Sequence, residues 1–237
     1  MAEVLSEVGI KSPHFNIFHL TYALSSPKPE ERKDAIRSFQ DIIPIAQDLG
    51  TNLLILPASP IHGVKTSPGR IYPGGPPETI EVTDVFHWEE AWETYVEVIG
   101  QCADIAQKAG LKIAVEPRPR EIITNADSML RLIHAIDRSN LGVLIDTAHL
   151  FVQKEILPIA IQKLRGHIYG LHLADNDGIL EYHWAPGKGS IDWPGVLRAL
   201  KRIGFDDYMT VEVSGVEDLD KEYKESRDYL VNLIKAL

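Results

Sequence analysis

The chain has a single cysteine, Cys102, so neither an internal disulfide nor a metal site of several thiolates can form. It also lacks any apolar run near the roughly 18 residues that a membrane-spanning helix needs. The segment from Met1 to Val8 is polar and amphipathic, without the charged and apolar regions of a signal peptide. We therefore expect a cytoplasmic protein with no membrane partner, and we place Cys102 in the core.

Basic residues are in deficit, with 24 Lys and Arg against 34 Asp and Glu and a formal net charge of −10. Nucleic-acid binding is driven largely by Lys and Arg that neutralise phosphates, so this balance disfavours a nucleic-acid partner. No Gly-x-Gly-x-x-Gly turn follows an expected strand, which weakens the case for a dinucleotide-binding sheet.

Strand and helix patterns alternate along all 237 residues. Short apolar runs predict strands at 15–20, 52–56, 112–116, 142–146, 168–173 and 208–213. Apolar spacing of three and four residues predicts helices near 29–49, 88–109, 126–138, 153–164, 193–203 and 217–236. Such alternation indicates an α/β fold with a parallel sheet. For one domain covering 1–237, the TIM (β/α) barrel is the leading architecture and a doubly wound sheet is the alternative.

Six strands are fewer than the eight of a complete barrel, and the chain opens on a helical pattern. We expect the first two strands of the usual eight to be lacking. An open sheet edge invites pairing or coverage, so we expect a homo-oligomer. The longest connection, residues 58–87, is rich in Pro and Gly and follows a strand. We expect a lid or an oligomer contact there, with disorder as the alternative.

Four ionisable side chains lie near the ends of short apolar runs: Glu116, Asp146, His172 and Glu212. An ionisable group at the end of a buried strand costs free energy unless it is paired or binds a metal. Barrel active sites lie at the carboxyl ends of the strands, where all four would meet. Three carboxylates and one imidazole suit a divalent ion such as Mn²⁺, Mg²⁺, Co²⁺ or Zn²⁺. The sequence therefore predicts one shared metal site.

Further polar side chains fall on the same expected face, namely His149, Glu181 and His183. The two histidines could bind substrate or a second metal, or they could serve as capping or surface residues. Gly187 and Gly189 would let the backbone approach a ligand closely.

Basic side chains near the expected mouth are open to two interpretations. Arg118 and Arg120 could hold a substrate phosphate as a fork, or could pair with Glu121 or another surface carboxylate. Lys188 could likewise bind substrate or form a surface ion pair. His14 has no constellation around it in the sequence, and we expect it to serve structure.

Several sequence motifs surround the candidate site residues: His172-Leu-Ala-Asp-Asn-Asp-Gly with His183, Pro186-Gly-Lys-Gly-Ser-Ile-Asp-Trp193, Val115-Glu-Pro117, Ile145-Asp-Thr-Ala-His149 and Val211-Glu212. Together they resemble the xylose isomerase-like TIM-barrel superfamily, which includes sugar isomerases and epimerases, inosose dehydratases and endonuclease IV. The resemblance covers the chain in order and is specific for the superfamily, but much less so for the substrate.

Similarity to the tagatose and psicose epimerase branch implies that the four predicted ligands hold one metal ion. Glu116 and Glu212 would then act as acid and base on opposite sides of a bound sugar or sugar phosphate. One carboxylate removes the weakly acidic proton next to the carbonyl, the metal stabilises the enediolate, and the other carboxylate returns a proton. The same resemblance implies that His149 and His183 hold sugar hydroxyls and that Trp184 covers an apolar ring face.

Three other functions remain open. A keto-inositol dehydratase would use a similar single metal. Endonuclease IV would use His19 as an N-terminal ligand and His149 with His183 for a further zinc. Residues 53–57 offer no histidine where that family has one, however, and Glu181 replaces its aspartate. A non-catalytic metal- or sugar-binding protein is the third alternative, because fold does not fix function.

Overall fold

The computed structural model describes residues 2–66, 79–83 and 87–237. Its main sheet has six parallel strands in the order β1-β2-β5-β6-β7-β8. They are β1 (Phe15–Asn16), β2 (Leu53–Pro57), β5 (Lys112–Glu116), β6 (Leu141–Asp146), β7 (Ile168–Leu173) and β8 (Met209–Val211). Within the described residues β1 and β8 are the edges of this sheet, and no ladder joins them.

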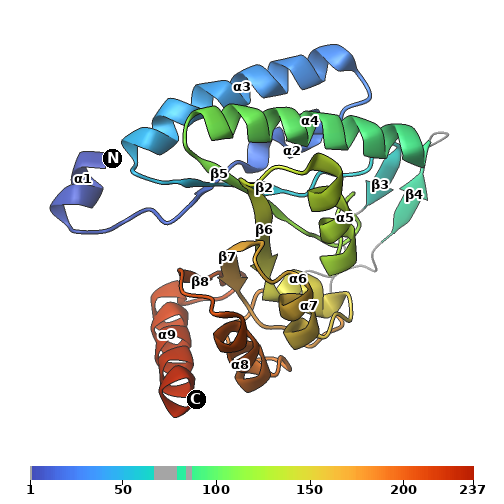
Figure 1. The fold of residues 1–237 in the computed structure, drawn as a ribbon. Helices are drawn as coiled ribbons and strands as arrows, with labels where there is room; N and C mark the ends of the chain where they lie inside the picture. The colour runs from blue at the N-terminus through green and yellow to red at the C-terminus, as the bar shows by residue number, and fades with distance from the viewer. Residues whose placement is uncertain (1, 67–78, 84–86) are drawn as a thin grey trace.

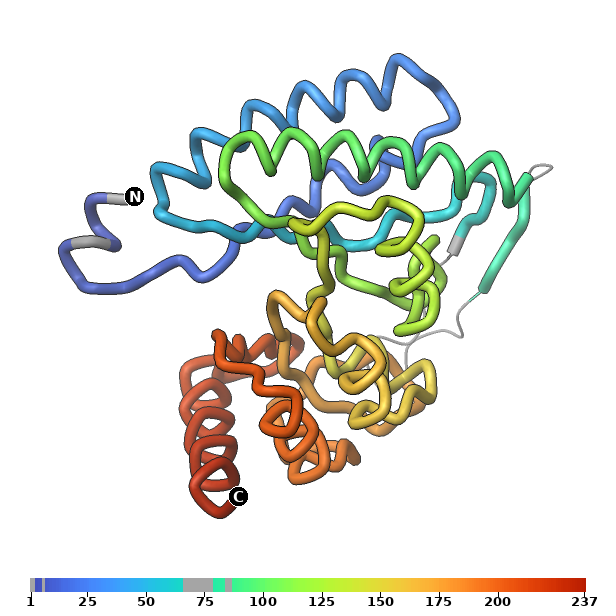
Figure 2. The backbone as a smooth tube through the Cα atoms, viewed as in Figure 1, coloured from blue at the N-terminus to red at the C-terminus, as the bar shows by residue number. Residues whose placement is uncertain are grey.

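The helices follow the sheet around one side, with α3 and α4 lying against each other and α8 against α9 (Figure 1). They are α1 (Ala2–Glu7), α2 (Thr21–Leu24), α3 (Pro29–Asp48), α4 (Trp88–Lys108), α5 (Ala126–Ile136), α6 (Thr147–Val152), α7 (Leu157–Lys163), α8 (Trp193–Ile203) and α9 (Leu219–Ala236). Helix α1 projects from the body of the molecule, and an extended segment leads from it to β1 (Figure 2). Among the described helices, none combines the length and apolarity that a bilayer crossing requires.

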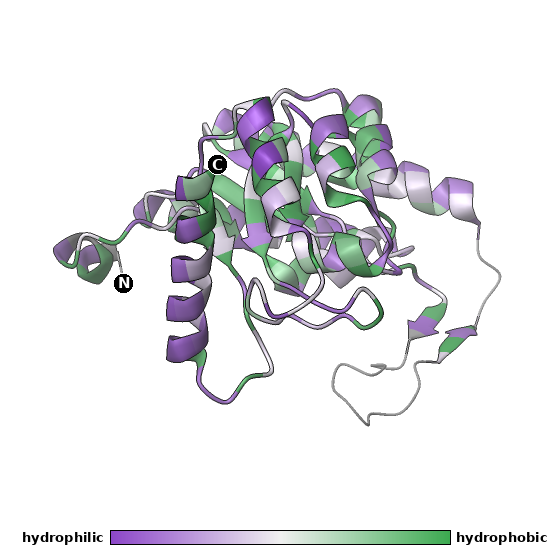
Figure 3. Ribbon diagram, turned by 90° about the horizontal axis from the view of Figure 1, so that it is seen from below, coloured by the Kyte–Doolittle hydropathy of each residue, from purple (hydrophilic) through white to green (hydrophobic). Residues whose placement is uncertain are grey.

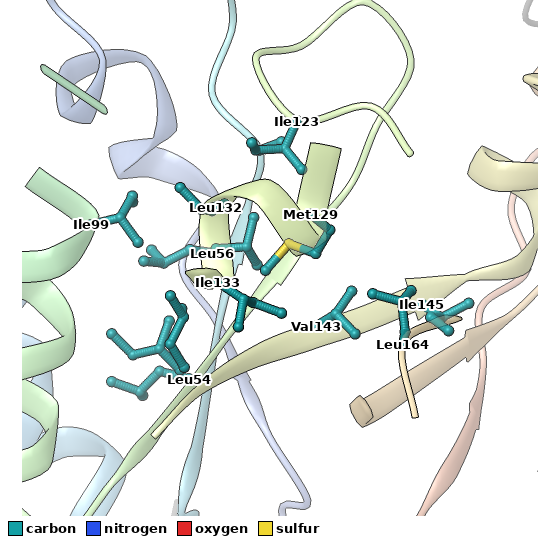
Figure 4. Close-up of a cluster of buried hydrophobic side chains, with 14 of the residues drawn as sticks. Leu54, Leu56, Ile99, Ile123, Met129, Leu132, Ile133, Val143, Ile145 and Leu164 are labelled. Atoms are coloured by element: carbon teal, nitrogen blue, oxygen red, sulfur yellow. The ribbon is translucent and has the colours of Figure 1, made fainter. Parts of the chain in front are cut away.

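Alternate residues of the strands face two different apolar clusters. The larger lies between the sheet and the helices, where Leu54, Leu56, Val143 and Ile145 pack with side chains of α4 and α5 (Figure 4). The smaller lies on the inner face and contains Leu53, Ile55, Ala114 and Leu144. Burial on both faces is the usual state of a parallel sheet. Apolar residues accordingly gather at the centre of the molecule and hydrophilic ones on the outer helices (Figure 3).

Two predicted elements were wrong in extent. The strand expected at 15–20 is only Phe15–Asn16, after which the chain forms a 3₁₀ turn at Phe18–Leu20 and then α2. A short apolar run does not by itself distinguish a strand from a helical turn. The helix expected at 153–164 is the shorter α7, which begins only at Leu157, and a separate short helix that was not predicted, α6, precedes it. Pro158 accounts for the late start, because it lies in the first turn of α7, where proline's missing N–H costs nothing.

The long connection contains an antiparallel hairpin of β3 (Val64–Thr66) and β4 (Ile80–Val82). Ile80 and Val82 are exposed rather than packed. Residues 67–78 and 84–86 lie outside the described part of the chain, so the expected lid or oligomer contact at 58–87 stays a prediction. Cys102, by contrast, is fully buried in α4 as expected, and burial raises the pKa of its thiol to about 12.

Candidate metal centre

The predicted ligands lie on the inner face of the sheet, at the carboxyl ends of four neighbouring strands. Glu116 is two residues after Ala114 of the inner cluster, and Asp146 is two residues after Leu144. His172 pairs in register with Asp146 across β6 and β7. Glu212 follows β8, and its N–H donates to the carbonyl of Leu173 over 3.1 Å, which continues the strand pairing.

The structure brings these four side chains into one cluster. One ligand atom from each lies within 4.8 Å of the other three. His172 Nδ1 is 3.0 Å from Glu116 Oε1 and 2.8 Å from Glu212 Oε2, so it faces two carboxylates at once. Glu116, Asp146 and His172 are buried, whereas the Glu212 side chain is 42% exposed.

Asp146 provides a test of whether a cation fits the cluster. Its Oδ1 accepts hydrogen bonds from the backbone N–H groups of Ala148 and His149, at 2.7 and 3.0 Å. Its Oδ2 is buried and has no hydrogen-bond partner among the described residues. A buried carboxylate oxygen without a partner is costly unless a cation binds it. Three carboxylates and an imidazole are also a donor set that divalent ions accept, so the residues fit a metal.

The cluster holds more negative charge than its neighbours neutralise. Burial acts to lower the pKa of His172, but hydrogen bonds to Glu116 and Glu212 outweigh it and raise that pKa to about 10. Burial acts to raise the pKa of Asp146, and nearby imidazoles, His149 first, reverse this and hold the pKa below its usual value. A proton on His172 thus balances charge that a divalent ion would balance instead.

A second group adjoins the first and shares Asp146 with it. Ligand atoms of Asp146, His149 and His183 also lie within 4.8 Å of one another, and the two histidine rings are 4.9 Å apart. His149 Nδ1 lies 2.9 Å from Glu181 Oε1, and Glu181 also meets Arg120 over 3.2 Å. Burial acts to lower the pKa of His149, but Asp146 and Glu181 raise it to about 9. These residues form a polar row leading away from the cluster.

Two other candidate substrate-binding residues make contacts near this row. Trp184 stacks on Tyr182, with ring centroids 4.5 Å apart, and its backbone pairs with that of Asp175. The Arg118 guanidinium lies 5.2 Å from the centre of the Phe18 ring. Because Arg118 lies over Phe18 while Arg120 meets Glu181, the two arginines do not form one fork in this structure.

Two candidates lie elsewhere. Lys188 binds Glu222 and Glu225 of α9, at 2.6 and 3.0 Å. His19 is exposed on the 3₁₀ turn, and no described contact joins it to the metal cluster.

Two residues near the site were given no site role from the sequence, where Glu121 was named only as a possible surface partner of Arg118 and Arg120. Glu121 lines a small cavity of about 170 Å³ with Arg118, Arg120 and Glu181, and burial raises its pKa to about 7. Its position five residues after Glu116 was the available signal. His14, which we expected to serve structure only, lies against the cluster, with its Nε2 3.2 Å from His172 Nε2. Burial, followed by the neighbouring His172, lowers the pKa of His14 to about 4.

Known proteins resemble this chain in sequence and in fold. Residues 2–233 match the family described as xylose isomerase-like TIM barrel. The chain is 24% identical to D-psicose 3-epimerase of Ruminiclostridium cellulolyticum over 192 residues, which are 80% of this chain and 58% of that protein. It is 30% identical to inosose isomerase of Bacillus subtilis over 133 residues, which are 53% of this chain and 48% of that protein. The chain thus spans about half the length of these curated relatives.

A solved structure shows the same fold. The crystal structure of IOLI protein with a bound zinc atom superimposes with a TM-score of 0.70 at 20% identity, covering 99% of this chain and 79% of the other. At this identity the likeness extends to the fold alone. The family match over nearly the whole sequence goes further, and the chain belongs to the xylose isomerase-like TIM barrel family.

Proposed function

We propose that this chain is a divalent-metal-dependent isomerase or epimerase of a sugar or sugar phosphate, and that it works by proton transfer through an enediolate. One observation carries the proposal: Glu116 Oε1 and Glu212 Oε2 flank His172 Nδ1, and the same cluster contains Asp146, whose Oδ2 has no hydrogen-bond partner among the described residues. The sugar-epimerase and inosose-isomerase relatives, and the zinc atom of the IOLI structure, support the same chemistry.

Glu116, Asp146, His172 and Glu212 would hold the metal, which would supply positive charge to the carbonyl and hydroxyl oxygens of the substrate. Glu116 and Glu212 would move the proton on the carbon next to the carbonyl, one removing it and the other returning it. Their surroundings differ, because Glu116 is buried and the Glu212 side chain is 42% exposed. A proton held by Glu212 would therefore exchange with solvent more readily than one held by Glu116.

The polar row would bind the rest of the substrate. His149 is held by Glu181 at 2.9 Å, and His183 lies beside it, so both rings can meet hydroxyl groups next to the metal cluster. Trp184, fixed by its stack on Tyr182, would cover an apolar face of the sugar. The Arg118 and Arg120 cavity is lined by Glu121 and Glu181 as well, which favours an uncharged sugar end over a phosphate.

The proposal extends to the sheet. The six described strands would be the last six of the usual eight, and a second copy of the chain would cover the edges at β1 and β8. Light scattering on the purified protein tests this, and a monomer at micromolar concentration would contradict it.

Metal analysis tests the proposed site. We would measure the metal content of the purified protein and of Glu116→Gln, Asp146→Asn, His172→Ala and Glu212→Gln, with His19→Ala as an exposed-histidine control. We expect about one ion per chain in the wild type and the control, and loss of the ion in the other variants. Absence of metal from the wild type after supply of Mn²⁺, Zn²⁺ and Co²⁺ would refute the proposal.

The second cluster gives the endonuclease alternative a specific basis, because Asp146, His149 and His183 could hold a further ion. About three zinc ions per chain would favour that alternative.

If the protein holds about one ion per chain, the next experiment is to incubate it with D-psicose and other ketoses in D₂O. Deuterium incorporation next to the carbonyl, detected by NMR, would support proton transfer.

A further inference from the structure

We propose that His14 is a positioning residue for the metal site, holding the His172 ring with Nδ1 turned toward the carboxylates. The inference rests on the proposed metal-dependent function. It assigns a role to a side chain that the sequence did not connect with the site, since His14 lies 158 residues from His172 along the chain.

The two nitrogens of His172 have different surroundings. Nδ1 faces Glu116 Oε1 at 3.0 Å and Glu212 Oε2 at 2.8 Å. Nε2, on the opposite side of the ring, lies 3.2 Å from Nε2 of His14. The two rings are tilted by 50° with their centroids 5.1 Å apart, so they meet at their edges rather than as a stack.

When a metal is bound, His172 is the donor and His14 the acceptor of the hydrogen bond between their Nε2 atoms. A ligating nitrogen carries no proton, so a His172 that binds through Nδ1 keeps its N–H at Nε2. His14 Nε2 then accepts this hydrogen bond as a neutral imidazole. Metal-binding histidines generally donate their second N–H to an acceptor that fixes ring orientation, and here the acceptor is another histidine.

The position of His14 explains why the ring needs this partner. His14 precedes edge strand β1 and lines a cavity of about 880 Å³ together with Leu53 and Gly170 of the inner face. Without His14, the Nε2 side of His172 would face this cavity. The ring could then turn over, which would exchange Nδ1 for the Cδ2 carbon on the side of the carboxylates, and the geometry of the proposed metal site would no longer be unique.

Cobalt binding tests the inference without relying on activity. We would titrate Co²⁺ into the full chain against a competing chelator and record the visible spectrum of the bound ion. The variants are His14→Phe, which keeps the shape but removes the acceptor, and His14→Gln, which keeps an acceptor oxygen. His19→Phe applies the same change to an exposed histidine. Circular dichroism checks that each variant folds, and His14→Leu replaces His14→Phe if the latter does not.

We expect His14→Phe to weaken Co²⁺ binding by about 10- to 100-fold and to change the visible spectrum. His14→Gln should bind within about threefold of the wild type by keeping the hydrogen bond, and His19→Phe should not differ from it. Equal affinity of His14→Phe and the wild type would overturn the inference, as would equal losses in His14→Phe and His14→Gln. Either of these results would leave the proposed function intact. A wild type that binds no Co²⁺ would contradict the proposed function as well as the role of His14.

Discussion

The candidate metal ligands and His14 fall into two groups, one on central strands of the sheet and one beside its edge strands. Glu116 and Asp146 end β5 and β6, strands with a neighbour on each side, and both side chains are buried. Glu212 and His14 adjoin the edge strands β8 and β1, and both are only partly buried. Strand pairing thus sets how far each group of the site is removed from water. The site therefore combines buried carboxylates on central strands with partly exposed side chains beside the edge strands.

The largest effect is expected on catalytic rate, and it should be similar for the buried Glu116 and the partly exposed Glu212. Glu116→Gln and Glu212→Gln should each lower kcat for the proposed ketose epimerisation by at least about 10²- to 10⁴-fold, because each removes a proton-transfer group and also a proposed ligand of the metal. NMR of the product ratio over time measures the rate, with His19→Gln as control. A large loss in the Glu116 variant alone would show that the exposed carboxylate is not part of the chemistry.

Stability should follow the comparison closely. In metal-free protein, Asp146→Ala should lower the free energy of unfolding by about 3 kcal/mol, since it removes a helix cap and the buried partner of charged imidazoles. Glu212→Ala should cost less than about 1 kcal/mol because its side chain is partly hydrated. Urea unfolding in the presence of chelator measures both, and Asp146→Asn, which keeps a cap acceptor, should fall between them. Equal costs would mean that edge and centre are supported alike.

The pH dependence of stability gives a smaller effect. Burial raises the pKa of Glu121 from 4.5 to about 7, so the folded state holds this proton more tightly than the unfolded state. The resulting stabilisation is complete below pH 4.5 and is lost as the pH rises through about 7. The glutamine of Glu121→Gln does not ionise. The free energy of unfolding of this variant, relative to that of the wild type, should therefore be higher at pH 8 than at pH 5 by about 1 kcal/mol, allowing for partial exposure. Thermal melts at both values measure this. A similar gain in Glu93→Gln, on the surface of α4, would argue against burial as the cause.

The smallest effect is expected at Lys188. Because its amine binds Glu222 and Glu225 at the surface, Lys188→Ala should change the free energy of unfolding by less than about 0.5 kcal/mol. The KM for a ketose should stay within about twofold, since a rim contact contributes little. A several-fold rise in KM in steady-state assays would restore the substrate-binding role that the sequence suggested.

The sequence predicted the parts of the site that depend on local pattern. Glu116, Asp146 and His172 end apolar runs, and in a parallel sheet such ends meet at one edge, so their convergence followed from the order of the strands. His14 could not be found in this way, because its place depends on how the segment before β1 approaches the inner face. The late start of α7 could have been predicted, since Pro158 marks the first turn of a helix.

One feature of the fold limits how this site could diversify. Asp146 is at once a member of the metal cluster and the N-cap of α6, and His149 is the third residue of that helix. A shift of His149 would therefore also move Asp146, so these two side chains cannot be repositioned independently. The loop that carries Glu181 and His183 is held mainly by Asp175, through backbone bonds to Trp184 and a bond from the Gly187 N–H, and Glu181 alone of the two forms an ion pair with His149. A change of substrate should therefore come more easily from a residue of this loop such as His183 than from Asp146, whose replacement would alter the candidate metal site and the start of α6 together.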